Sequence, residues 1–265
     1  MSKFVVIIFP NETKAYEGTV ALKELHGEGS IVLYSTAVLS KNDEGTISVR
    51  EAATGGPLGT AVGALVGGLV GLLGGPVGVA VGLTGGALVG AAGDLFNTGI
   101  SAAFVKTISD ELSPGKTAVI AEIQEDWVTP LNTRMEEIGG TIIRTPRSDI
   151  EDEQIEKEVA ARKAEFERIR AEYAQAADEA RTRLKKSLDA AKQDLEEASE
   201  RARTRAEGLK KEAAAKVDAL EKQAKQAAAD AEARIRTTIA SLQTEYDRRT
   251  AKLNKAWDLA KDALS

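Results

Sequence analysis

Residues 51–94 read EAATGGPLGTAVGALVGGLVGLLGGPVGVAVGLTGGALVGAAGD, and no charged side chain stands between the glutamate and the aspartate at its two ends. Glycine recurs there at every fourth position, in two overlapping series. The predicted packing glycines are Gly55, Gly59, Gly63, Gly67, Gly71 and Gly75 in the first series, and Gly74, Gly78, Gly82, Gly86 and Gly90 in the second. Because residues four apart share one face of an α-helix, each series predicts a smooth strip that another backbone can approach closely.

Leucine and valine occupy most positions between these glycines, so each predicted helix has an apolar face opposite its glycine face. Pro76 follows the Gly74–Gly75 pair, where one helix is expected to end and the next to begin. We therefore predict a glycine-zipper helical hairpin over residues 54–96. Its two helices of about twenty residues are each about as long as a bilayer's hydrocarbon layer is thick. The hairpin is expected to enter a membrane, to form the apolar core of a soluble assembly, or to remain a flexible glycine-rich loop.

Composition disfavours several classes of function. The formal net charge of −6 does not suit nucleic-acid binding, and aromatic residues make up only 4% of the 265 residues. Cysteine is absent, which excludes disulfides, cysteine-based zinc sites and a thiol nucleophile. The apolar run of residues 4–9 is too short for the core of a signal peptide. We expect a cytoplasmic start with no signal peptide, and membrane association through the hairpin.

The segments on either side of the hairpin, residues 1–53 and 97–148, predict one split head. Strands are expected at 4–9, 31–39, 46–50, 117–123 and 141–143, and helices at 12–25, 100–112 and 130–138, with Asn11 as a helix cap. This order predicts an α+β head with an antiparallel sheet and helices on one face, as in ferredoxin-like folds. The head is expected to fold even when residues 54–96 are replaced by a short linker.

A family resemblance rests on the opening strand and helix, the glycine-zipper insert, and two short segments, SPGKTA at 113–118 and GGTIIRT at 139–145. Together these features resemble a family of uncharacterised bacterial predicted membrane proteins (domain of unknown function 1269). The similarity covers residues 3–148. It implies no known activity, cofactor or catalytic residue.

Residues 149–265 form the third region, a predicted very long α-helical tail of one or a few helices. This region has no proline and one glycine, Gly208, and is rich in the helix formers Ala, Glu, Lys and Arg. Apolar residues recur every eleven positions, a hendecad repeat of about 3.67 residues per turn that keeps them on one side of a helix. The predicted tail-packing residues are Ile169, Leu184, Leu195, Leu209, Val217, Leu220, Ile235, Ile239, Leu242, Tyr246, Leu253 and Trp257.

This apolar stripe requires a partner, because a single helix cannot bury it. Association with other copies of the chain, as in a coiled coil, is the expected arrangement. A lipid surface is an alternative, since hendecad amphipathic helices also bind interfaces. The tail also has a weak resemblance to apolipoprotein-like and late-embryogenesis-abundant helical repeats, which leaves open a free helix that becomes ordered under stress.

Residues with catalytic or metal-binding chemistry are few. His26, the only histidine, is expected to be exposed or to cap the end of a helix. Six acidic residues gather at a predicted helix start, where negative charge complements the helix dipole, and we expect this role and not metal binding. They are Asp149, Glu151, Asp152, Glu153, Glu156 and Glu158. The glycine-rich segment lacks the Lys-Ser/Thr ending of a P-loop. We predict no catalytic residue, metal, cofactor or small-molecule substrate.

These patterns predict a non-enzymatic, self-assembling, membrane-associated scaffold or stress-related structural protein. The glycine-zipper hairpin would anchor it, and the long helix would join copies into a homo-oligomer. A wholly soluble ring, cage or filament with the hairpins as an internal apolar layer is the alternative. An oligomeric pore is a further alternative.

Overall fold

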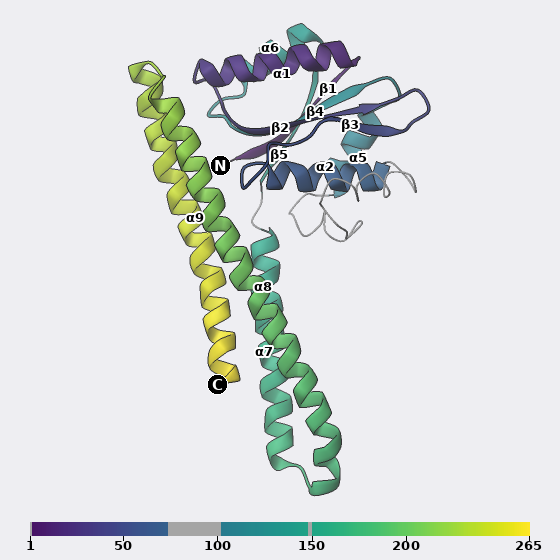
Figure 1. The fold of residues 1–265 in the computed structure, drawn as a ribbon, viewed down its shortest axis with the longest axis vertical. Helices are drawn as coiled ribbons and strands as arrows, with labels where there is room; N and C mark the ends of the chain where they lie inside the picture. Colours follow the sequence, from purple (N-terminus) through teal and green to yellow (C-terminus); the bar gives the residue numbers. More distant parts are fainter. Residues whose placement is uncertain (1, 74–101, 148–149) are drawn as a thin grey trace. The chain divides into compact units, whose positions relative to one another are not determined.

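A computed structural model describes residues 2–73, 102–147 and 150–265 of the chain (Figure 1). The chain divides into two compact units. The first unit contains Met1–Ser148 and Ala214–Leu242, and the second contains Asp149–Ala213 and Gln243–Ser265. We call residues 2–147 the head and residues 214–242 the 214–242 hairpin.

The head is built on a five-stranded sheet in which every pair of neighbouring strands is antiparallel. Its strands, in the order β3-β2-β4-β1-β5, are β1 (Lys3–Phe9), β2 (Val32–Lys41), β3 (Ile47–Glu51), β4 (Thr117–Gln124) and β5 (Thr141–Pro146). Side chains of β1 alternate between two apolar layers, with Val5, Ile7 and Phe9 in one and Phe4, Val6 and Ile8 in the other. The predicted mixed class and antiparallel sheet are confirmed.

Helices cover both faces of this sheet, and not one face as the sequence predicted (Figure 1). Helices α1 (Glu12–Gly27) and α6 (Thr129–Ile138) pack over the layer that contains Val5 and Ile7. Helices α2 (Thr60–Leu73) and α5 (Ala102–Glu111) pack over the opposite layer. The side chain of Asn11 accepts a hydrogen bond from the Lys14 amide, so the predicted cap of α1 is confirmed.

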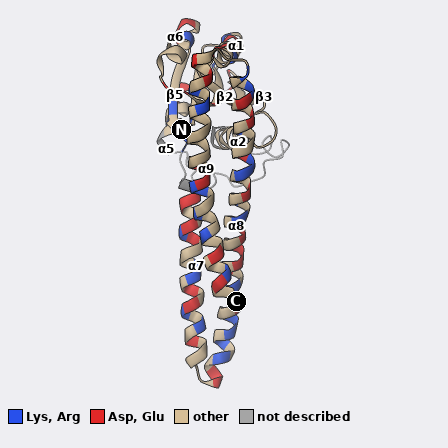
Figure 2. Ribbon diagram, turned by 90° about the vertical axis from the view of Figure 1, so that its left-hand side faces the viewer, with Lys and Arg blue, Asp and Glu red and all other residues tan. Residues whose placement is uncertain are grey.

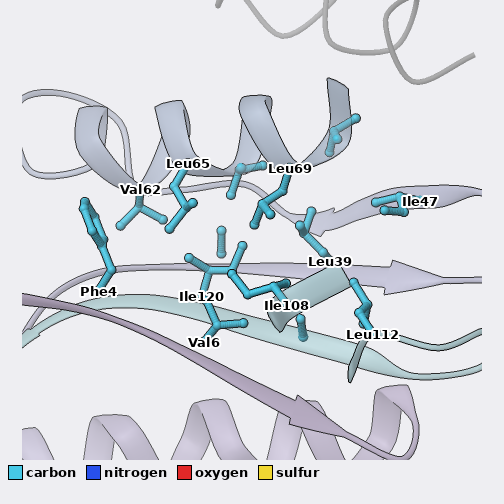
Figure 3. Packing of buried hydrophobic residues seen from close by; sticks show 14 of the residues in the cluster. Phe4, Val6, Leu39, Ile47, Val62, Leu65, Leu69, Ile108, Leu112 and Ile120 are labelled. Carbon is cyan, nitrogen blue, oxygen red and sulfur yellow. The ribbon is translucent and has the colours of Figure 1, made fainter. Parts of the chain in front are cut away.

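Helix α2 is part of the head's core, which corrects the predicted boundary of the hairpin at residue 54. Five of its side chains are buried together with residues of β1, β2, β4 and α5. Figure 3 shows Val62, Leu65 and Leu69 of α2 directed towards Ile120 and Leu39 of the sheet. The described part of residues 54–96 is therefore continuous with the head and is not a separate insert.

The spacing of the buried residues explains this packing. Val62, Leu65, Val66, Leu69 and Val70 follow the three- and four-residue intervals of one helix face. Burying a valine or leucine side chain contributes about 1.5–3 kcal/mol. Five such residues make α2 a major source of head stability. Whether the head folds without residues 54–96 stays a prediction, and removing them would take these five side chains out of the core.

The tail forms three helices, α7 (Ile150–Gln175), α8 (Asp178–Ala224) and α9 (Ala229–Leu264). The predicted long helix is confirmed by the 47 residues of α8, but the chain reverses at 176–177 and again at 225–228. Neither break contains glycine or proline, so no residue type typical of a turn marks either position. Lys, Arg, Asp and Glu are interspersed along all three helices, whereas α2 carries none (Figure 2).

The second unit contains α7, the first part of α8 and the last part of α9. An ion pair between Arg162 and Asp194 joins α7 to α8, with 3.1 Å between nitrogen and oxygen. The hydroxyl of Tyr246 in α9 donates to Glu212 in α8, and both residues belong to this unit. The apolar stripe is thus covered by helices of the same chain.

Candidate functional site

Helix α2 has two chemically different faces. Its valine and leucine face is buried in the head, as described above. The other face carries Gly63, Gly67 and Gly71, and no described atom lies within 4 Å of where a Cβ would stand on any of them. Gly67 is exposed. Along this face a second backbone can approach α2 without meeting side chains from α2 itself.

The predicted glycine strip is only partly helical. Gly55 lies in the loop before α2, and Gly56 has a φ of +82°, in the left-handed region that favours glycine. Helix α2 consequently begins at Thr60 and not near Gly55, and Gly59 directly precedes it. The remaining predicted packing glycines, Gly74, Gly75, Gly78, Gly82, Gly86 and Gly90, lie outside the described residues.

The membrane prediction concerns α2 and the sequence that follows it. The described part of α2, Thr60–Leu73, has 14 residues, and the sequence from residue 74 to residue 101 lies outside the described residues. Among residues 2–73, 102–147 and 150–265, no helix is both long enough and apolar enough to be a candidate membrane span.

The head and the 214–242 hairpin share a buried charge cluster at the end of β4. Glu122 is fully buried, and its Oε1 lies 2.5 Å from Nζ of Lys216 and 2.9 Å from Nη1 of Arg147. Lys216 is itself fully buried, and its Nζ stands 4.6 Å from the centre of the Tyr34 ring. A carboxylate and an aromatic face thus compensate a lysine that has lost its water.

An irregularity in β2 places the Tyr34 ring. The pairing of β2 with β4 shifts register between Leu33 and Ser35, on either side of Tyr34. The Tyr34 hydroxyl donates to Oε1 of Gln124 at 3.0 Å, which fixes the orientation of its ring. Ser35 then resumes the pairing, directly opposite Glu122.

Gln223 provides a second attachment of the hairpin. Its Nε2 donates to the backbone carbonyls of His26, at 2.6 Å, and of Ile31, at 3.0 Å. His26 lies in the last turn of α1, and its carbonyl also accepts from the Gly29 N–H at 3.1 Å, so Gln223 adds a second donor at this helix end. Farther along, the Arg234 guanidinium lies 5.7 Å from the centre of the Trp127 ring.

Three buried oxygens in this region have no hydrogen-bond partner among the described residues. They are Ser35 Oγ, Glu122 Oε2 and Gln223 Oε1. Each such group costs about 1–3 kcal/mol when it is removed from water without compensation. The attachment of the 214–242 hairpin is therefore rich in polar contacts and incompletely satisfied.

A second charge cluster is centred on Glu125, which directly follows β4. The carboxylate of Glu125 is buried and accepts from Lys3 at 3.2 Å and from Arg144 at 2.9 Å. Arg144 also donates to Oδ1 of Asn132 in α6 at 2.6 Å. This network joins β1, β4, β5 and α6, so its evident role is to hold the head together.

His26 is half-buried, and not exposed as the sequence suggested. Its Nδ1 accepts a hydrogen bond from the Leu33 amide at 3.3 Å. Burial lowers the pKa of His26 below its ordinary value of 6.5, and a backbone hydrogen bond at Ile31 opposes that shift. The ring therefore supports the turn between α1 and β2.

Three of the predicted acidic residues near the start of α7, Glu151, Asp152 and Glu158, pair with arginines of the same unit, and Asp149 lies outside the described residues. Asp152 is buried; its Oδ1 lies 2.8 Å from Nε of Arg205 and its Oδ2 lies 2.5 Å from Nε of Arg249. Glu151 also pairs with Arg205, and Glu158 pairs with Arg201. No group of three or more metal-ligating side chains converges within the described part of the chain.

The predicted tail-packing residues lie on the covered side of their helices. The buried ones are Ile169, Leu195, Leu209, Leu220, Ile235, Leu242, Tyr246 and Leu253, and the half-buried ones are Leu184, Val217, Ile239 and Trp257. Their packing within one chain gives the stripe a partner that the sequence analysis did not consider, a second and third helix of the same tail. Whether copies also associate through the tail stays a prediction.

The Glu122–Lys216 and Asp152–Arg249 pairs were not among the residues predicted from the sequence. One signal was present, because Glu122 interrupts an otherwise apolar strand, as TAVIAEIQ shows for residues 117–124. A charge in such a strand needs a partner. The partners lie 94 and 97 residues away along the chain, and no local pattern identifies them.

A comparison with protein families matches residues 60–160 to the family described as "Protein of unknown function (DUF1269)". The matched segment begins at α2 and ends in α7, so it includes the glycine face, Glu122 and Asp152. The resemblance predicted from the sequence is confirmed. No curated protein and no solved structure matches the chain.

Proposed function

We propose that the protein is a non-enzymatic, membrane-associated scaffold that assembles with copies of itself through the glycine face of α2 and the charge-free sequence that follows it. The proposal keeps α2 on the head, because its apolar face is already used there. Association then depends on the face that carries Gly63, Gly67 and Gly71. Small residues on one helix face let another helix approach closely, in lipid or out of it.

The observation that carries this proposal is the division of α2 into a buried Leu/Val face and an open glycine face. A helix that served only the head core gains nothing from three glycines on its outer side, since each lowers helix propensity by about 1 kcal/mol relative to alanine. Glycine spacing of four residues continues in the sequence beyond Leu73. The open face and that sequence therefore form one candidate association element.

A wholly soluble assembly is the second candidate, and one observation favours it. Helix α2 places its most apolar residues against the sheet, so the first half of the predicted hairpin is not free to enter lipid with the second half. In this version the glycine face packs against another copy in water. The tail would then be a charged spacer that is folded on itself.

For the head we propose a ferredoxin-like arrangement with one added edge strand. Strand β4 lies between β1 and β2, and β1 lies between β4 and β5. Helix α1 connects β1 to β2 and α6 connects β4 to β5, which makes two split βαβ units. Strand β3 extends the sheet beyond β2.

The experiment compares the wild-type chain with a Gly63→Leu/Gly67→Leu variant after cell fractionation and a carbonate wash, together with light scattering of the soluble fraction. Leucine is a better helix former than glycine, so the variant's head is expected to fold. Gly208→Leu is the matched control, because Gly208 is an exposed helical glycine that also has nothing within 4 Å of its Cβ position.

Each outcome separates the two candidates. Wild-type retention in membranes that falls in the double variant but not in Gly208→Leu supports the membrane scaffold. A soluble wild-type oligomer that dissociates in the double variant supports the soluble assembly. A wild-type chain that is monomeric and leaves the membrane fraction contradicts both.

A further inference from the structure

The attachment of the 214–242 hairpin differs from the rest of the first unit. The two hydrophobic clusters described for the head, one on each face of the sheet, consist entirely of residues before 148. The hairpin is attached at the end of the sheet by Lys216, by Gln223 and by the stacking of Arg234 on Trp127. These separate polar contacts go to the end of α1 and the start of β2, and to residues at or just after the end of β4.

We propose that the 214–242 hairpin is a releasable latch, which detaches from the head while the sheet and its two apolar layers stay folded. Release removes no side chain from either of the two clusters, so it leaves their packing intact. Parts of a protein that open before global unfolding are those with few buried apolar contacts to the remainder. This device is independent of the association proposed for α2.

Polar groups that release would expose to water lower the stability of the attached state relative to the released state. Oε2 of Glu122, Oε1 of Gln223 and Oγ of Ser35 are buried without a hydrogen-bond partner among the described residues, and water would satisfy all three after release. Glu122 keeps Arg147 as a partner in the open state, because both belong to the head. Lys216 loses the carboxylate and the Tyr34 ring but gains full hydration.

Helical structure inside the hairpin is expected to persist after release. The backbone hydrogen bonds of α8 and α9 are internal to each helix, and the turn at 225–228 is closed by Gln226 N–H to Gln223 O, at 3.1 Å, and by Lys225 N–H to Glu221 O, at 3.2 Å. Release therefore moves a preformed helical hairpin and does not unfold one. This distinguishes a latch from a segment that frays.

Gly29 provides a close contact that reports the closed state. An ideal Cβ built on Gly29 would lie 3.1 Å from the Cβ of Ala231, so the loop after α1 and the start of α9 touch. Residues Glu28 and Asp230, which neighbour this contact, are both exposed. They are therefore suitable positions for paired spin labels.

The test measures distances by pulsed electron paramagnetic resonance in the full chain. The chain has no cysteine, so Glu28→Cys and Asp230→Cys place the only two labels. A second pair, Glu28→Cys and Thr133→Cys, lies within the head and serves as the reference. Lys216→Met is expected to raise the fraction of long Glu28–Asp230 distances at least tenfold and to leave the reference distances unchanged.

Gln223→Ala is the milder second variant, which keeps the buried ion pair, and it is expected to raise the same fraction several-fold. Hydrogen exchange of the unlabelled wild-type chain in mild denaturant provides an independent measurement if Lys216→Met does not fold. In that measurement, the equilibrium constant for opening the Lys216 and Gln223 contacts is expected to be at least tenfold larger than the constant for opening the β1 and β4 amides. The amides of the His26–Val32 loop would therefore exchange earlier than those of the two strands. Unchanged distances in both variants, or equal protection of that loop and the two strands, would overturn the proposal.

Discussion

Asp152, in the first turn of α7, and Arg249, in α9, form a buried ion pair between residues 97 positions apart, with Nε 2.5 Å from Oδ2. The two side chains are only 4% and 2% exposed, and Arg205 reaches the other oxygen of the same carboxylate. Helices α7, α8 and α9 thus meet at one carboxylate. This junction has a measurable consequence for the second unit.

Arg249→Met is expected to lower the free energy of unfolding by about 3–5 kcal/mol, because it leaves Asp152 buried with less compensation. Chemical denaturation followed by circular dichroism measures the change. Arg201→Met is the matched control, since the Arg201–Glu158 pair joins α8 to α7 at side chains that are 50% and 40% exposed. Exposed pairs contribute about 0–1 kcal/mol. Similar effects of the two substitutions would show that burial of the Asp152 pair has no energetic importance.

The core position of α2 predicts a large effect from a single truncation there. Leu69 is fully buried, so Leu69→Ala is expected to destabilise the head by about 2–5 kcal/mol. Val20→Ala on α1, where the side chain is 55% exposed, is expected to change stability by no more than about 0.5 kcal/mol. Urea unfolding with a probe in the head gives both values. A small effect of Leu69→Ala would restore the view of α2 as an insert separate from the head.

Most elements of the head could be predicted from the sequence because their signals are local. Short runs of apolar residues identified β1 and β4, and Asn11 marked a helix start. The sequence Asn42-Asp43-Glu44-Gly45 between β2 and β3 is typical of a hairpin turn. Gly45 adopts a φ of +84° in that turn, as a hairpin of this kind requires. Periodicity and turn chemistry act over a few residues, so one sequence suffices to read them.

The position of α2 could not be predicted in this way. A face of valine and leucine suits lipid and a protein core equally well, because both are apolar. The lack of charge between residues 51 and 94 suggested a membrane. An apolar sheet face also requires an uncharged apolar helix to cover it, so the same sequence suits both environments. Only the partner of that face distinguishes the two, and the partner lies in strands that are distant along the chain.

The tail shows a similar limit. Three leucines that follow the eleven-residue spacing, Leu195, Leu209 and Leu220, are fully buried in α8. The same spacing continues across the turn at 225–228, where the chain reverses and a continuous helical row has no meaning. Since the turn contains neither glycine nor proline, composition alone could not decide between one helix and a few.

Two glycines of α1 are expected to respond to alanine in opposite directions. A Cβ on Gly18 would lie 2.3 Å from Cζ of Phe9, a fully buried ring, so Gly18→Ala forces α1 and β1 apart and is expected to cost about 1–3 kcal/mol. Gly27 ends the same helix and has nothing within 4 Å of its Cβ position. Gly27→Ala is expected to be neutral or to stabilise by up to about 1 kcal/mol. Thermal unfolding of the two variants compares them directly, and equal shifts would contradict the packing of Phe9 on Gly18.

His26 predicts a pH dependence of stability whose sign follows from its lowered pKa. In the unfolded chain the ring takes up a proton as the pH falls through about 6.5, whereas in the folded chain burial delays protonation to lower pH. Between these two pKa values the unfolded state binds more protons. The free energy of unfolding therefore decreases as the pH falls through this range, with a slope of at most about 1.4 kcal/mol per pH unit.

This dependence can be assigned to one residue, because His26 is the only histidine of the chain. His26→Asn keeps a side-chain acceptor near the Leu33 amide and removes the titrating ring. Urea unfolding between pH 8 and pH 5.5 is expected to show a smaller decrease for His26→Asn than for the wild-type chain. The wild-type stability at pH 8 contains the full contribution of the neutral, buried ring, so the two curves should differ in slope below about pH 7. Parallel curves would mean that the pKa of His26 is the same in the folded and unfolded chain.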